Sequence, residues 1–472
     1  MLVIHGDDDA IRPHAAGAAL AEAAGGRLIT MEGSGHGPQG RDPVKVNRII
    51  EDFVRSLHRS VEPERWTRAA RRPKRALYLS SPIGLGHARR DVAVAAELRR
   101  LHPDLQIDWL AQHPVTKVLD QAGERVHPAS RWLANESAHI EDECADHDLH
   151  AFQAIRRMDE ILVNNFMVFH DLVEADHYDL VIGDEAWEVD HFLHENPELK
   201  RFAFAWMTDF VGWLPMPDGG EQEIALTADY NLEMIEQRAR YRRLRDTSIF
   251  VGEADDIVPA SFGPGLPDIR TWTEANFEFS GYVTGFDPAD VADRTALRSE
   301  LGYRPDERVC LVTVGGSGVG EPLLRRVIAA APAIRRLVDD VRMVVVSGPR
   351  IDPRRLPCPD GVEIRSFLPD LHRHLAACDI AIVQGGLTTC MELTANRRPF
   401  IYVPLRHHFE QTFHVPHRLE RHRAGRRLDY DELADVDRLA TMVAEELERD
   451  IDYVAVDTGG AARAARAIAE LL

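Results

Sequence analysis

The amino-acid sequence predicts an α/β protein with two Rossmann-like, doubly wound domains that face one another, preceded by a short α/β segment. A strand, a glycine-rich loop and a helix follow one another near residue 80 and again near residue 314. After each opening, short apolar runs typical of buried strands alternate with helical patterns. The 472 residues are 44% hydrophobic and 28% charged, an ordinary globular composition with room for two to three domains.

The net charge narrows the classes of partner. The chain carries 77 acidic and 56 basic side chains, a formal net charge of -21. Such a surface repels phosphate backbones and anionic lipid, so we expect no nucleic-acid partner. The sequence has no run of 18 apolar residues, so we do not expect an integral membrane protein. The five cysteines form no CxxC pair, which argues against a disulfide framework or a cysteine zinc site and favours the cytoplasm.

Residues 1–58 form the first predicted unit, with strands at 2–5 and 27–31 and an amphipathic helix over 44–57. Turns in this unit carry Asp9 and His36. The pattern resembles the C-terminal end of an α/β-hydrolase, which implies that Asp9 is a triad acid and His36 a triad base. No GxSxG elbow precedes Asp9, so we expect a vestigial hydrolase segment without hydrolase activity, which can still dock on the rest of the chain.

Residues 59–75 are basic and lack apolar periodicity, which predicts an interdomain linker. The first large domain is predicted at 76–286 and opens with a strand over 76–81, the loop Gly84-Leu85-Gly86-His87 and a helix over 88–101. The sequence predicts further strands at 105–111, 179–182, 201–206 and 277–283, and a long helix over 150–176. The acidic stretch 141–148 is expected to be a solvated face.

The second large domain is predicted at 287–472. It opens with a strand over 309–314, the loop Gly315-Gly316-Ser317 and a helix over 321–337. Further strands are predicted at 342–347, 362–367, 380–383 and 399–403. Glycine loops at helix N-termini allow close backbone approach and favour an anion.

The most specific stretch is 378–411, in which a buried strand ends at Gln384 and Gly385-Gly386 opens a helix. Together with the glycine loops, it resembles GT-B glycosyltransferases, close to the C-terminal domain of MurG-like family 28 and the UDP-glycosyltransferases. The resemblance implies a donor site for a sugar nucleotide, in which glycine loops and hydroxyls hold the diphosphate, Glu392 holds the ribose and 410–411 contact the sugar. Many relatives have His or Arg where this chain has Gln384. The implied donor-binding residues are Gly84, Gly86, Gly315, Gly316, Ser317, Phe367, Leu368, Gln384, Gly385, Gly386, Thr388, Thr389, Glu392, Glu410 and Gln411.

The resemblance also assigns the catalytic residues. His87 ends a GxGH loop, and in UDP-glycosyltransferase relatives this His is the general base for the acceptor hydroxyl, oriented by an Asp about a hundred residues later. Asp184, at the end of a predicted strand, is that Asp in this chain. An imidazole has a suitable pKa, and a carboxylate fixes its tautomer. In MurG-like enzymes the same His touches phosphate, so both roles stay open.

The predicted function is therefore transfer of a sugar from a nucleoside diphosphate, UDP above all, to an acceptor hydroxyl, with inversion and with no cofactor besides the UDP-sugar co-substrate. The acceptor, a small molecule or a lipid, has no motif in the sequence. The alternatives are a sugar-nucleotide epimerase of the same fold, a silent binding protein, and a hydrolase–transferase fusion with an incomplete triad. The histidines at 407, 408, 414, 417 and 422 invite a metal site, but no HExxH occurs and we expect none.

Overall fold

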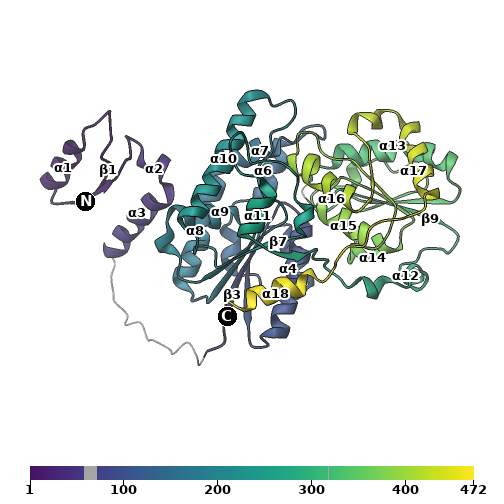
Figure 1. The fold of residues 1–472 in the computed structure, drawn as a ribbon, viewed down its shortest axis with the longest axis horizontal. Coiled ribbons are helices and arrows are strands. Elements are labelled where there is room, and N and C mark those ends of the chain that lie inside the picture. Colours follow the sequence, from purple (N-terminus) through teal and green to yellow (C-terminus); the bar gives the residue numbers. More distant parts are fainter. Residues whose placement is uncertain (58–71, 317) are drawn as a thin grey trace.

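The computed structural model describes residues 1–57, 72–316 and 318–472. Two six-stranded parallel sheets, each flanked by helices, form the two large domains, and a smaller two-stranded unit precedes them (Figure 1). The predicted fold class is confirmed. Ser317 and most of the predicted linker at 59–75 lie outside the described residues.

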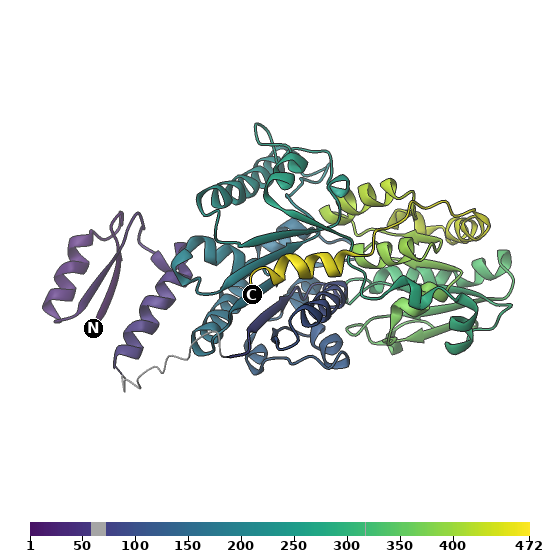
Figure 2. The ribbon, with the colours of Figure 1, turned by 60° about the horizontal axis from the view of Figure 1, so that its bottom comes forward.

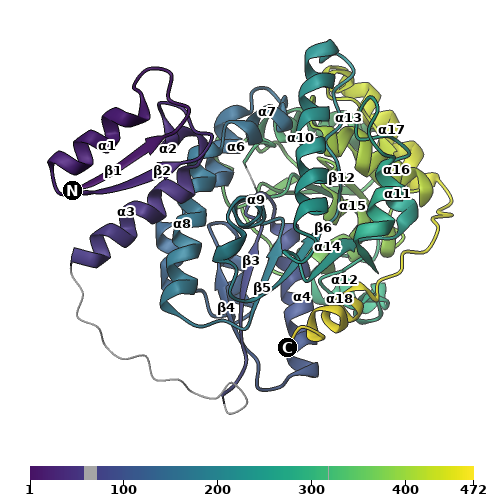
Figure 3. The ribbon, with the colours of Figure 1, turned by 60° about the vertical axis from the view of Figure 1, so that its left-hand side comes forward.

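The N-terminal unit packs on the first large domain, as Figure 3 shows for α3 and α8. Val44 of α3 is buried in a cluster that contains Phe166 and Phe169 of α8, and Arg48 Nη1 lies 3.2 Å from His170 Nδ1. This segment therefore buries apolar surface against the rest of the chain. Its elements are β1 (Leu2–Gly6), α1 (His14–Ala23), β2 (Arg27–Met31), α2 (Pro38–Arg41) and α3 (Pro43–Leu57).

The first large domain has the strand order β4-β3-β5-β6-β7-β8, so the order reverses between β3 and β5. Ligands of open α/β sheets bind at such a switch point, beyond the carboxyl ends of the strands. The elements are β3 (Arg75–Ser80), α4 (Leu85–Leu101), β4 (Gln106–Leu110), α5 (Val115–Gln121), α6 (Glu136–Glu143), α7 (Ala151–Arg156), α8 (Asp159–Ala175), β5 (Leu180–Asp184), α9 (Trp187–Glu195), β6 (Ala203–Thr208), α10 (Gly220–Arg240), β7 (Thr247–Val251), α11 (Ile269–Asn276) and β8 (Glu278–Gly281).

The second large domain has the order β11-β10-β9-β12-β13-β14, with its switch point between β9 and β12. Its elements are α12 (Arg294–Glu300), β9 (Arg308–Thr313), α13 (Glu321–Leu337), β10 (Val341–Val346), β11 (Val362–Arg365), α14 (Leu371–Ala377), β12 (Ile380–Val383), α15 (Leu387–Ala395), β13 (Phe400–Tyr402), a π-helical turn (Glu410–His414), α16 (Val415–Arg421), β14 (Arg426–Arg427) and α17 (Val436–Glu448).

The last helix, α18 (Gly460–Ala469), leaves the second domain and packs against α4, β7 and β8 of the first (Figure 2). Ala464, Ala465 and Ile468 join Val94 and Leu98 of α4 in one buried cluster. The structure differs here from the predicted second domain of 287–472, because the apolar stripe of α18 is buried by the first domain rather than the second.

Two local predictions are corrected. Helix α4 begins at Leu85 rather than 88, with Gly84 as its N-cap, so His87 lies in its first turn. The predicted helix over 150–176 is two helices, because Met158 is buried with non-helical backbone between α7 and α8. No helix in the described ranges is both long and apolar enough to cross a lipid bilayer.

The acidic stretch 141–148 is only partly a solvated face: Asp142 and Asp146 are exposed, but other residues of the stretch contact the second domain. Arg350 Nε donates to Glu141 Oε2 at 2.6 Å, and His407 Nδ1 lies 2.6 Å from Asp148 Oδ1. The other ring nitrogen of His407 lies 2.8 Å from Asp218 of the first domain. Glu141 and Asp148 therefore contact basic side chains across the domain boundary.

Candidate functional site: a cleft between the two domains

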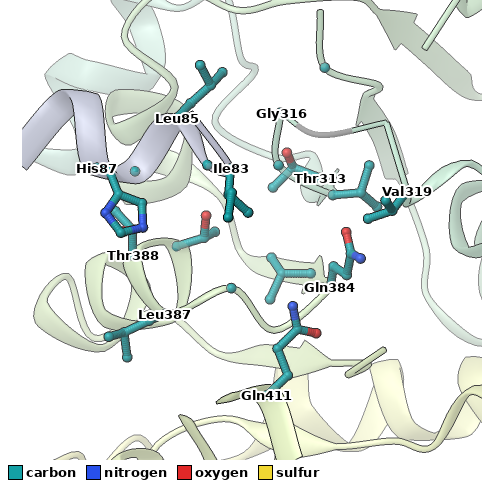
Figure 4. Close-up of a pocket in the computed structure, with 18 of the residues that line it drawn as sticks. Ile83, Leu85, His87, Thr313, Gly316, Val319, Gln384, Leu387, Thr388 and Gln411 are labelled. Atoms are coloured by element: carbon teal, nitrogen blue, oxygen red, sulfur yellow. The ribbon is translucent and has the colours of Figure 1, made fainter. Parts of the chain in front are cut away.

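The carboxyl ends of both sheets open into one cleft, shown in close-up in Figure 4. The loops after β3 and β6 line it from the first domain, and the loops after β9, β10, β11, β12 and β13 line it from the second. Most residues predicted from the sequence line this cleft: Gly84, Gly86, His87, Gly315, Gly316, Phe367, Leu368, Gln384, Gly386, Thr388, Thr389, Glu392, Glu410 and Gln411.

His87 and Asp184 meet at the switch point of the first sheet. Asp184 is the last residue of β5 and pairs with Ser80 at the end of β3, just before the loop that leads into α4 and His87. His87 Nδ1 lies 3.0 Å from Asp184 Oδ2, although the two residues are 97 positions apart. Arg90 Nη2 lies 2.8 Å from the same nitrogen, so Nδ1 contacts both Asp184 and Arg90, and Nε2 is the ring nitrogen left to exchange a proton.

Arg90, one turn after His87 on α4, was not predicted from the sequence and organises this pair. Its guanidinium donates from Nε to Asp184 Oδ2 at 2.8 Å and from Nη1 to Asp209, which lines the cleft. The Arg90 side chain is 3% exposed and that of Asp184 is fully buried. An i, i+3 spacing from His87 on an amphipathic helix was the only sequence signal, and it does not separate a buried arginine from a surface one.

The charges around His87 shift its pKa upward. Burial and the Arg90 charge would lower that pKa, but the carboxylates of Asp184 and Glu185 outweigh them and raise it to about 9. Asp184 is buried, yet Arg90 and His87 hold its pKa well below the usual range. Burial raises the pKa of Glu185 to about 7. The cluster therefore keeps the Asp184 carboxylate ionised and raises the pH at which His87 loses its proton.

The second domain presents glycine loops at its own switch point. Gly315 follows β9 with φ of 79°, and Gly385 follows β12 with φ of 95°, conformations that favour glycine. Gly386 is the N-cap of α15, whose first turn holds Thr388 and Thr389. The free backbone N–H groups of that turn and two hydroxyls therefore offer donors to an anion in the cleft.

Two glycines are also required where the domains touch. A Cβ on Gly86 would lie 2.1 Å from Thr388 Oγ1, and a Cβ on Gly316 would lie 2.7 Å from Leu85 Cγ. Each glycine therefore faces a side chain of the opposite domain. From the sequence, these glycines are expected to let a phosphate approach the backbone closely. The structure adds a second reason: a larger residue would collide with the opposite domain.

Two buried polar groups in the cleft lack partners among the described residues. Glu392, 1% exposed, has no hydrogen bond to Oε1, and Gln384, 5% exposed, has none from Nε2. Burial raises the pKa of Glu392, although the Arg89 charge acts in the opposite direction. Buried polar atoms normally have a hydrogen-bond partner. The Glu392 acceptor and the Gln384 donor are therefore available to a polar ligand in the cleft.

Glu410 and Gln411 begin a π-helical turn, a feature often found at functional sites. Gln411 Oε1 accepts from the Leu405 N–H at 2.9 Å, which fixes the side chain against the loop after β13. Burial, with Asp209 and Glu185 nearby, raises the pKa of Glu410 to about 8.

Arg89 is the one arginine among the described residues that line the cleft, and the sequence did not single it out.

His87, Glu185 and Asp209 place potential metal-ligand atoms within 4.8 Å of one another. Arg90 already bonds Asp209 there and lies 3.8 Å from Glu185, so a guanidinium supplies positive charge at this position. The histidine run at 407–422 contributes to no ligand cluster in the described ranges, and His407 serves the domain contact instead.

The structure also brings Asp9 and His36 together in the N-terminal unit. His36 Nδ1 lies 3.0 Å from Asp9 Oδ2, and the His36 side chain is 54% exposed. This is the acid–base arrangement implied by the hydrolase resemblance, which stays a prediction.

Comparison with known proteins supports the assignment of the second domain. Residues 309–471 match the glycosyltransferase family 28 C-terminal domain. Over 190 residues the chain is 30% identical to an uncharacterized glycosyltransferase of Methanopyrus kandleri, covering 39% of this chain and 52% of the relative. Over 161 residues it is 32% identical to the UDP-N-acetylglucosamine--N-acetylmuramyl-(pentapeptide) pyrophosphoryl-undecaprenol N-acetylglucosamine transferase of an Exiguobacterium species, covering 34% and 43%. The chain thus spans about half of these relatives or less.

Solved structures share the two-domain architecture. The spinosyn rhamnosyltransferase SpnG superimposes with a TM-score of 0.52 at 18% identity, over 84% of this chain and 95% of SpnG. At this identity the likeness concerns the fold alone. The chain therefore has the two-domain GT-B fold, and residues 309–471 match the glycosyltransferase family 28 C-terminal domain.

Proposed function

We propose that the chain is a glycosyltransferase that moves a sugar from a nucleoside diphosphate, UDP above all, to an acceptor hydroxyl. The observation that carries the proposal is one cleft with His87, backed by Asp184, on one wall and the glycine loops of the second domain on the other. The UDP-linked donor named for the Exiguobacterium relative supports UDP as the nucleotide.

The diphosphate would lie between the loops after β9 and β12. Backbone N–H groups near Gly315 and Gly316 and the N-terminus of α15 supply preorganised donors, and Arg89 supplies a charge. Such donors stabilise the negative charge that develops on a departing diphosphate. The net charge of -21 opposes anion binding at long range, so these local groups must provide the affinity. No resident metal is needed in this scheme.

The remaining donor contacts follow from the polar groups in the cleft. Glu392 would accept from ribose hydroxyls, which satisfies its partnerless oxygen. Phe367 and Leu368, in the loop after β11, would hold the base through backbone groups. Glu410 and Gln411 would contact the transferred sugar, near the anomeric carbon and His87.

The transfer itself would be a direct displacement. His87 Nε2 removes the acceptor proton while the acceptor oxygen attacks the anomeric carbon from the face opposite the diphosphate. The bond between that carbon and the diphosphate oxygen breaks, and the nucleoside diphosphate leaves with the electron pair, so the configuration inverts. Asp184 stabilises the imidazolium and keeps its Nδ1–H oriented. The acceptor would approach along Ile83, Ile140 and Leu149, which line the cleft from the first domain and favour an apolar molecule.

An epimerase of the same fold is the second candidate. Glu410 lines the cleft with a pKa of about 8, so a protonated carboxyl is available beside a sugar. Incubation of a UDP-sugar without acceptor distinguishes the two activities. Appearance of the epimeric UDP-sugar would favour the epimerase, and an unchanged donor would favour transfer.

The purified protein is expected to bind UDP by calorimetry, and an excess of EDTA should change the affinity less than about twofold. Thr388→Val combined with Thr389→Val should weaken UDP about tenfold, because two hydroxyl donors are lost. The matched pair Thr271→Val and Thr295→Val, outside the cleft, should retain the affinity. An absence of measurable heat with UDP and UDP-sugars would refute the proposal, and abolition of binding by EDTA would refute metal independence.

The pH dependence of kcat/KM should report the proton on His87. A base must be neutral, and His87 has a pKa of about 9, so the rate should rise about tenfold per pH unit below that value and level off above it. Asp184→Asn removes a carboxylate that raises this pKa, so the rising limb should move to lower pH, with a smaller plateau. An identical limb in wild type and variant would show that His87 is not the titrating base.

A further inference from the structure

A second pocket lies at the opposite end of the second sheet from the cleft, at the amino ends of β9, β12 and β13. Its volume is about 550 Å³. The lining comes from the start of the second domain, the turn after α15 and the segment after α17. Five arginines and one carboxylate line it: Arg294, Arg308, Arg397, Arg398, Arg449 and Asp379.

Asp379, the one carboxylate in the pocket lining, already accepts hydrogen bonds from two arginines. Asp379 accepts from Arg294 Nη2 at 2.6 Å and from Arg298 Nη1 at 2.9 Å, and Arg308 Nη1 lies 3.8 Å away. Arg449 pairs with Glu446 at 3.3 Å. Arg397 donates both terminal nitrogens to the carbonyls at 451 and 453. These contacts leave the pocket with an excess of positive charge.

Two arginines keep free donors. Arg398 donates only its Nε, to the Asn396 carbonyl at 2.9 Å, and no carboxylate of the described residues lies within 4.0 Å of its guanidinium. The Arg308 side chain makes no hydrogen bond to any of the residues that the structure describes, and it is 53% exposed. Burial, with the charge of Arg294 nearby, lowers the pKa of Arg398. A half-buried guanidinium without a counter-ion is unfavourable, and an oxyanion would relieve this cost.

The pocket also lies where the two domains are connected. Pro288, Val291 and Arg294 line it from the segment that enters the second domain. Arg449 and Ile451 line it from the segment that returns toward α18 on the first domain. A bound anion would therefore contact both interdomain connections.

We propose that this pocket binds a phosphate-bearing small molecule at a site separate from the cleft. Guanidinium groups match the oxygens of phosphate in pairs, and several of them select a multivalent oxyanion over chloride. The proposal concerns binding and is independent of the transfer reaction.

The test is calorimetric titration of inorganic phosphate into the full chain in a chloride buffer of constant ionic strength. One site is expected, weakened at least about tenfold in the double variant Arg308→Gln with Arg398→Gln. Arg354→Gln with Arg355→Gln removes the same charge at side chains 89% and 68% exposed and should leave the affinity unchanged. Because Arg398 is half-buried, Ala292→Glu offers a second variant at an exposed lining position, and it should also weaken phosphate.

Phosphate could instead enter the cleft, so Thr388→Val with Thr389→Val is titrated in parallel and should bind phosphate normally. If this cleft variant loses the site while the arginine variant retains it, the pocket proposal is wrong. The pocket proposal is also wrong if phosphate does not bind at tens of millimolar. It is equally wrong if the control variant Arg354→Gln with Arg355→Gln loses as much phosphate affinity as the pocket variant. Failure of UDP binding with intact phosphate binding would refute the proposed transferase function alone.

Discussion

Replacing His87 by alanine is expected to lower kcat for sugar transfer about 10³-fold while leaving the affinity for UDP within about twofold. The imidazole is placed to take the acceptor proton, and its Nδ1 is held at 3.0 Å by Asp184. The diphosphate is assigned to backbone donors and hydroxyls of the second domain, which the substitution does not touch. Initial rates with a UDP-sugar and calorimetry with UDP on the same preparation separate the two effects.

His102→Ala is the matched control, because this histidine caps the other end of the same helix. Its kcat should equal that of the wild type. Loss of UDP affinity together with transfer in His87→Ala would instead assign His87 to phosphate contact, the second role left open by the sequence. Full activity of His87→Ala would remove it from the reaction altogether.

Replacing Arg90 by leucine is expected to destabilise the first domain by about 3–5 kcal/mol. The substitution leaves the carboxylates of Asp184 and Asp209 buried without the guanidinium that pairs with both. For a domain of this size the loss corresponds to a fall in Tm of roughly 10 °C, measured by scanning calorimetry. Removing this cation also raises the carboxyl pKa values, so the deficit should shrink as the pH falls and these groups take protons.

Arg100→Leu on the same helix is the control for the stability measurement. Arg100 pairs with Glu97 at 2.8 Å, and the two side chains are 76% and 27% exposed, so its loss should cost about 1 kcal/mol or less. Equal shifts in Tm for the two variants would show that the buried network around Arg90 carries no special stability.

The strands of the second domain could be predicted closely because parallel strands are short apolar runs bounded by turns. The predicted strand at 380–383 and helix at 321–337 have the bounds that the structure gives to β12 and α13. The predicted helix over 150–176 is interrupted, because Met158 is buried in a cluster that includes Leu405 of the other domain. Local periodicity contains no information about that contact.

The candidate site shows the same division. Glycine loops and hydroxyls could be named from the sequence because they lie at predicted strand ends, and the His87–Asp184 pair because the GxGH loop resembles that of UDP-glycosyltransferases. Arg90 could not, because no motif or resemblance marks it and its partners Asp184 and Asp209 are 94 and 119 residues away. The role of the acidic stretch 141–148 was also hidden, because Arg350 and His407, which contact it, come from the second domain.

The sequence by itself determined two doubly wound domains, their glycine loops and most of the residues that line the cleft, because strand periodicity and loop chemistry are local. Only the tertiary structure decided how the domains close on one another, that α18 returns to the first domain, and that Arg90 joins two carboxylates beneath His87. These features depend on which distant charges and apolar faces become buried together. That burial sets the pKa of His87, and it is a property of the assembled fold rather than of any one segment.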